Sequence, residues 1–158
     1  MTDAIELNTV RKTLFRRYLT MLVPAAIIFG GWAAARQSGL VNGMGQQFTD
    51  IIGPAVFIIS ILLAVALPLL YRIRFVKDVA GTHGVNMEEF MPFQLNSMAL
   101  ALIAPYAAAI GYMAGISNFH FSGAFLAALY GAYYYFPAEK RIAKEMKMFR
   151  VNADNKDA

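Results

Sequence analysis

Residues 51–71 read IIGPAVFIISILLAVALPLLY, a run of 21 residues without Asp, Glu, Lys or Arg. The hydrocarbon core of a bilayer needs about 20 apolar residues in an α-helix, so this run predicts a membrane-spanning helix. Three further runs without a charged residue lie at 18–35, 95–116 and 119–136. We expect an all-α, polytopic membrane protein whose four transmembrane helices form two antiparallel hairpins, with both termini on the cytoplasmic side.

The composition supports this class of protein. Hydrophobic residues make up 58% of the chain and charged residues 15%, whereas a soluble domain has about 25% charged residues. The chain has no cysteine, which excludes a disulfide scaffold and thiolate chemistry. The runs are continuous, unlike the alternating ten-residue segments of a membrane barrel. The net charge of +4 would suggest nucleic acid in a soluble protein, but here the basic residues flank apolar runs. We therefore expect the lipid bilayer, and no nucleic acid, as the partner of these basic residues.

The basic residues also predict the orientation. Of the 14 Lys and Arg residues, all but Arg36 lie before residue 18, between 72 and 94, or after residue 136. Cytoplasmic segments of membrane proteins carry the excess of Lys and Arg. We expect a basic amphipathic cytoplasmic segment at 1–17, the transmembrane domain at 18–136, and a cytoplasmic helical extension with a polar tail at 137–158. The expected location is a bacterial cytoplasmic (inner) membrane.

A signal peptide is the alternative for the first run, because Ala33-Ala34-Ala35 resembles a cleavage site. The 17 residues that precede the run are many for the basic region of a signal peptide, so the sequence favours a retained helix.

Several residues are expected at the membrane interface. In residues 5–17, Val10 and Leu14 are expected to lie on lipid, and Ile142, Met146 and Phe149 form a stripe that lies on the membrane or docks a soluble partner. Residues 87–91 predict a short interfacial helix that Pro92 ends or bends. The basic and aromatic residues assigned to the headgroup level are Arg16, Arg17, Arg72, Arg74, Lys140, Arg141, Tyr133, Tyr134 and Tyr135.

Small residues recur every four positions in three of the runs, which places each set on one helix face. Such faces let membrane helices approach closely. Those of the third and fourth spans are expected to meet each other, and at least one face then remains for a membrane-protein partner or a second copy. The sets are Ala26, Gly30 and Ala34; Ala107, Gly111 and Gly115; and Gly123, Ala127 and Gly131.

Candidate sites for chemistry are few. His83 with Glu88 and Glu89 is a weak metal candidate whose spacing matches no standard site. His120 is a weak cofactor candidate for a quinone or for a haem shared with another subunit. The predicted topology separates the two histidines by a membrane thickness, about 30 Å, so they cannot hold one haem. We expect no cofactor in the chain alone.

The function stays open between classes at this point. The chain lacks the motifs G-x-S-x-G, H-E-x-x-H and G-x-x-x-x-G-K-[ST], so an enzyme is not favoured. The first hypothesis is a non-catalytic membrane subunit, anchor or assembly factor of a larger complex. The second is a small oligomeric transporter or channel for a neutral or lipid-like substrate, based on Pro105 and on Asn96-Ser97. A quinone- or haem-associated anchor subunit is a third possibility.

Overall fold

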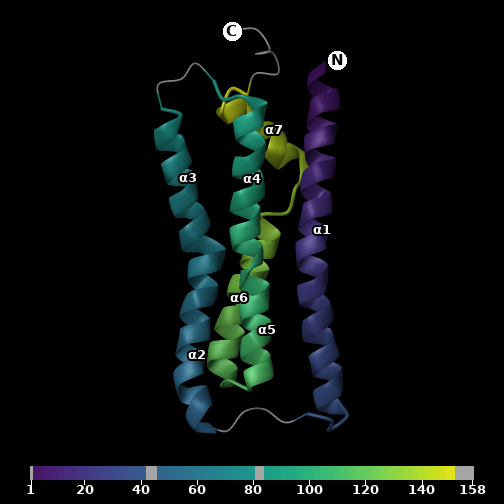
Figure 1. The fold of residues 1–158 in the computed structure, drawn as a ribbon, viewed down its shortest axis with the longest axis vertical. Coiled ribbons are helices and arrows are strands. Elements are labelled where there is room, and N and C mark those ends of the chain that lie inside the picture. The colour runs from purple at the N-terminus through teal and green to yellow at the C-terminus, as the bar shows by residue number, and fades with distance from the viewer. Residues whose placement is uncertain (1, 42–45, 81–83, 152–158) are drawn as a thin grey trace.

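The computed structural model describes residues 2–41, 46–80 and 84–151, and each element in these ranges is helical. Figure 1 shows the helices arranged as one elongated bundle. In chain order they are α1 (Thr2–Gln37), α2 (Gln46–Ile61), the π-helical turn η1 (Leu62–Ala66), α3 (Leu67–Asp78), α4 (Met87–Leu102), α5 (Ala104–Ala114), α6 (Asn118–Tyr134) and α7 (Glu139–Met148).

Three helical stretches are long and apolar enough to cross a membrane. They are Leu7–Gln37, Asp50–Asp78 and Met87–Ala114, and they contain all or most of the first three predicted spans. This is compatible with an integral membrane protein. Helix α6 has 17 residues, or about 26 Å at 1.5 Å per residue, which is shorter than these three stretches.

The bundle has a central group of helices and two flanks. Helices α4, α5 and α6 occupy the centre, α1 lies on one side, and α2 with α3 lies on the other (Figure 1). Helix α1 contacts α4, α5 and α7, whereas α2 contacts α5 and α6. The first two predicted spans are therefore not packed together as a hairpin of neighbours. The eight residues from 38 to 45 can reach about 26 Å, so this connection does not force the two helices together.

Prolines account for the irregular turns. Pro68 follows the π-helical turn, whose wider spacing suits a residue that cannot donate to the carbonyl of Ala64. Pro105 follows the interruption at Ile103 between α4 and α5. Pro92 was expected to end or bend the helix, but α4 continues through it to Leu102. Buried Phe90 and Phe93 pack this turn against neighbouring aromatic rings, which keeps it helical.

The end of the bundle where α1 begins and α7 lies is called here the terminal end (Figure 1). Helices α1, α3 and α4 extend beyond the end of α6, and α7 lies in that space beside α1. Ile142 of α7 and Phe149, which directly follows α7, are buried, as are Val10 and Leu14 of α1. These side chains were expected to meet lipid or a soluble partner. They pack on the chain's own helices instead. The predicted amphipathic segment is the start of α1, and α7 lies against α1.

Candidate functional site

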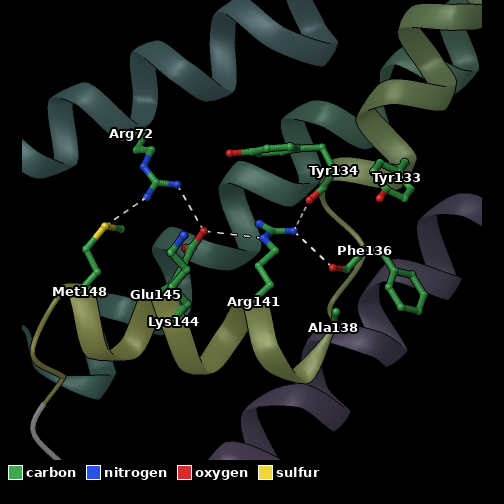
Figure 2. A pocket seen from close by; sticks show the side chains of 9 residues that line it. All are labelled: Arg72, Tyr133, Tyr134, Phe136, Ala138, Arg141, Lys144, Glu145 and Met148. Atoms are coloured by element: carbon green, nitrogen blue, oxygen red, sulfur yellow. Dashed lines mark hydrogen bonds and ion pairs between the residues drawn. The ribbon is translucent and has the colours of Figure 1, made fainter.

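A buried carboxylate lies at the terminal end of the bundle. Glu145 of α7 is 7% exposed and accepts hydrogen bonds from the Arg72 guanidinium of α3, at 3.2 Å, and from the Gln94 side chain of α4. Its Oε1 also lies 3.6 Å from the Nε of Arg141. Side chains of α3 and α4 therefore meet at one carboxylate of α7, and Figure 2 shows the contacts of Arg72 and Arg141 with it. A buried charge needs such partners, because an isolated one is strongly unfavourable.

Local helix geometry explains part of this cluster. Arg141 and Glu145 are four residues apart on α7 and so lie on one face. Glu145 also follows Ile142 by three residues and precedes Phe149 by four, which places the acid on the buried face of α7. Sequence reasoning missed Glu145, although an acidic residue within an apolar stripe is a signal for a buried ion pair.

The same arginine closes the end of α6. Arg141 donates to the carbonyl of Tyr134 at 2.5 Å and to that of Phe136 at 3.4 Å, and its guanidinium lies 5.4 Å and 4.9 Å from the ring centroids of Tyr134 and Tyr135. The Tyr18 hydroxyl of α1 donates to the carbonyl of Ala132 at 2.9 Å.

The last four carbonyls of a helix have no partner within it. In α6, Tyr18 and Arg141 donate to the carbonyls of Ala132 and Tyr134. The carbonyls of Gly131 and Tyr133 accept from the backbone N–H groups of Tyr135 and Phe136. All four carbonyls of Gly131–Tyr134 thus have a donor, two of them side chains of other helices. Side chains of α1 and α7 therefore hold the end of α6.

A cavity of about 460 Å³ opens beside the ion pairs. Arg72, Arg141 and Lys144 contribute cationic side chains to its lining, and Glu145 contributes the carboxylate. Tyr133, Tyr134, Phe136, Ala138 and Met148 complete it (Figure 2). A second cavity of about 110 Å³ lies between η1, α3 and α6 and shares Arg72 and Tyr134 with the first. The arrangement combines cations, phenols and apolar surface, which suits the binding of an amphiphilic anion.

The predicted interface residues have unequal environments. Arg16, Arg17, Arg74, Lys140, Tyr133 and Tyr134 are exposed, as a headgroup-level position requires. Arg72 and Arg141 are instead half-buried in the ion-pair cluster, and Tyr135 is buried in the core. The sequence predicted an interfacial position for these three residues. It did not predict their contacts, because these involve residues of other helices.

The helix-packing residues also divide into two groups. On α5 and α6, Gly111 faces Val56 of α2, and Gly123 faces the ring of Phe57. Both stripes therefore receive side chains of α2, and α5 and α6 also pack against each other. On α1, Ala26, Gly30 and Ala34 are exposed. The remaining members are half-buried or buried, namely Ala107, Gly115, Ala127 and Gly131.

Gly115 also ends a helix. Its φ of +73° ends α5 in the left-handed region, where glycine is favoured, and the N–H of Ile116 bonds to the carbonyl of Gly111 at 3.3 Å. It is a helix terminator as well as a small residue.

His120 lies at the opposite end of the bundle, in the first turn of α6. A Cβ on Gly53 of α2 would lie 2.9 Å from its Nδ1, so the ring fills the space that this glycine leaves open. The same nitrogen is hydrogen-bonded to Ser117 Oγ at 2.8 Å, and the ring neighbours Phe57 and Phe119. These contacts give His120 a packing role between α2 and α6.

The weak metal candidate can be placed only in part. His83 lies outside the described residues, and Glu88 and Glu89 are exposed in the first turn of α4. Within residues 2–41, 46–80 and 84–151, no group of three or more acidic or histidine side chains is close enough to hold a metal ion.

Comparison of the chain with protein-family models, with curated proteins and with solved structures found no significant match in any of the three.

Proposed function

We propose that the chain is a non-catalytic membrane subunit, an anchor or assembly factor, which binds a partner in the membrane through α1. In this proposal α1, the α2–α3 stretch, the α4–α5 stretch and α6 all span the bilayer. The terminal end then lies on the cytoplasmic side.

The position of α6 and of the basic residues supports four spans. Helix α6 lies beside α2 and α5. The three residues 115–117 connect it to α5. The described basic residues gather at the start of α1, the end of α3 and along α7, whereas Arg36 lies at the other end of α1. Because cytoplasmic ends carry the excess of Lys and Arg, this distribution favours a cytoplasmic terminal end.

The unused face of α1 is the observation that carries the partner proposal. The stripes on α5 and α6 are filled by α2, but a Cβ added at Gly30 or Gly31 would meet nothing within 4 Å. Ile27, on the same side of α1, is 67% exposed. Glycine is about 1 kcal/mol less favourable than alanine in a helix interior, so lipid contact alone does not explain why glycines occupy these positions of α1. A closely approaching helix does, because small residues let two backbones meet.

The transporter alternative has less support. The side chain of Asn96 donates to the Tyr71 hydroxyl at 3.2 Å, which ties α4 to α3. Pro105 lies just after the interruption at Ile103 and accompanies a change of helix geometry. Neither residue lines either of the two cavities described above.

The experiment compares complex size after extraction in a mild detergent, by blue-native electrophoresis. Gly30→Leu should release the partner or second copy while the thermal midpoint of the chain does not fall, since Gly30 is exposed and a Cβ there would meet no atom within 4 Å. Ala55→Leu is the matched control, because Ala55 is an exposed small residue on α2. A wild-type chain that migrates as a monomer, or a Gly30→Leu variant that keeps its complex, would contradict the proposal.

A further inference from the structure

The larger cavity at the terminal end has more cationic side chains than its one carboxylate can neutralise, and it adjoins an apolar cavity. We propose that it binds the phosphate group of one anionic phospholipid, one of whose acyl chains enters the adjoining cavity between α3 and α6. The inference rests on the part of the proposed function that places the terminal end on the cytoplasmic side of a bilayer, and it is independent of any partner on α1.

Charge is the first step of the argument. Arg72, Arg141 and Lys144 line the cavity together with a single carboxylate, that of Glu145, which leaves two positive charges in excess. Glu145 engages the two arginines, while the described residues offer no carboxylate within ion-pair distance of Lys144. Phosphate oxygens are strong acceptors for ammonium and guanidinium groups. The hydroxyl of Tyr134 also projects across this cavity in Figure 2, where it can donate to the same group.

The size and surroundings fit a headgroup. The volume of about 460 Å³ falls within the range of about 300–1,000 Å³ that is usual for small-molecule sites. Tyr133 at its rim is 85% exposed, and Tyr134 is 44% exposed. Tyrosines are enriched at the level of lipid headgroups. Basic pockets between membrane helices on the cytoplasmic side are known to bind anionic lipid headgroups.

The adjoining cavity distinguishes a lipid from a free phosphate or an acidic peptide. Its lining is largely apolar, and it includes Ala64, Val65, Leu69 and Tyr130. Because both cavities are lined by Arg72 and Tyr134, the apolar one begins where the cationic one ends. Ala64 lies eight residues before Arg72, which is about 12 Å along the helix axis. A soluble anion has nothing to place along this apolar groove, whereas a phospholipid has an acyl chain.

The first test measures lipid retention by native mass spectrometry of the detergent-purified chain. The wild type should retain phosphatidylglycerol at least about tenfold better than phosphatidylcholine, since only the former carries a net negative charge. Lys144→Gln should weaken phosphatidylglycerol retention about fivefold, the value of one basic residue near an anionic surface. Lys140→Gln is the matched control, because Lys140 is exposed on the same helix outside the cavity. Equal retention of the two lipids, or equal behaviour of the two lysine variants, overturns the proposal.

The second test locates the acyl chain. Val65→Trp should fill the apolar cavity and reduce phosphatidylglycerol retention, whereas Ile110→Trp on α5 should not. Both side chains are partly exposed, at 39% and 60%, so neither change buries a larger side chain in the core. Inorganic phosphate at millimolar concentration should fail to displace the lipid. Full displacement by phosphate, or equal retention by the two tryptophan variants, would show a site for a soluble anion and overturn the assignment to a lipid. Complex size, which tests the α1 proposal, is not expected to change in these variants.

Discussion

At the scale of single residues, glycines of this chain differ in what surrounds them. Gly53 and Gly123 leave space for the side chains of His120 and Phe57, and a Cβ at either position would clash. A Cβ at Gly30 would meet no atom within 4 Å. The same residue type therefore serves tight packing within the chain on α2 and α6, and an open face on α1.

Gly123→Ala should destabilise the chain, because the Phe57 ring occupies the position of the new methyl group. Phe57 has little freedom to move away, since Phe119 and His120 flank it. Overpacking of this kind costs about 1–3 kcal/mol. The thermal midpoint in detergent should fall for Gly123→Ala and should hold or rise for Gly30→Ala, since alanine is the better helix former and has room there. Adding Phe57→Leu to Gly123→Ala should restore part of the loss. Equal midpoints for the two single variants would show that the α2–α6 contact is not tight.

Glu145→Gln should be the most destabilising single substitution in the ion-pair cluster. It removes the carboxylate that neutralises Arg72 and Arg141, and breaking a buried pair costs about 3–5 kcal/mol. Glu139→Gln is the control: its partner is Arg11 at 3.3 Å, but its side chain is 64% exposed, so its loss should cost less than about 1 kcal/mol. Thermal unfolding in detergent compares the two. Similar midpoints would mean that the cluster is hydrated and contributes little to stability.

At the scale of helices, the end of α6 depends on two other elements. Tyr18 of α1 and Arg141 of α7 supply the donors for the carbonyls of Ala132 and Tyr134. These two bonds tie the end of α6 to α1 and to α7, so the three helices are expected to depend on one another for their positions at this end.

Tyr18→Phe should therefore destabilise the chain by about 1–3 kcal/mol, because it leaves the Ala132 carbonyl without a donor while keeping the aromatic ring. The ring itself continues to pack edge-on against Phe136. Tyr133→Phe removes a hydroxyl from a side chain that is 85% exposed, and it should leave the thermal midpoint unchanged. If Tyr18→Phe matches the wild type, water or lipid satisfies this carbonyl.

The sequence predicts the helices of this fold better than their contacts. A run such as 51–71 predicts a helix because apolar length alone requires one in a bilayer, and α2, η1 and α3 do cover it. The start of α1 and the path through Pro92 were less predictable, because buried contacts of Leu14 and Phe93 override the local signals. Glu145 could not be assigned from spacing alone. Its partners Arg72 and Gln94 are 73 and 51 residues away along the chain.

At the scale of the whole molecule, the two ends of the bundle differ in charge and in construction. The terminal end holds the ion pairs of Glu145, the described basic residues other than Arg36, and the larger cavity. The opposite end holds His120, Ser117 and the left-handed turn at Gly115. Such asymmetry predicts a single orientation in the membrane, with the terminal end in the cytoplasm.

That orientation can be tested with single cysteines, because the chain has none of its own. Ser38 and Ser117 are exposed at one end of the bundle, and Lys77 and Lys147 are exposed at the other. In intact cells, a membrane-impermeant maleimide should label Ser38→Cys and Ser117→Cys, whereas Lys77→Cys and Lys147→Cys should react only after the membrane is opened. The pair Ser117 and Lys147 decides whether α6 crosses, since these residues lie on either side of it. Labelling of both from the same side would reduce the chain to three spans, place α7 on the outer surface, and remove the cytoplasmic setting on which the anionic lipid site depends.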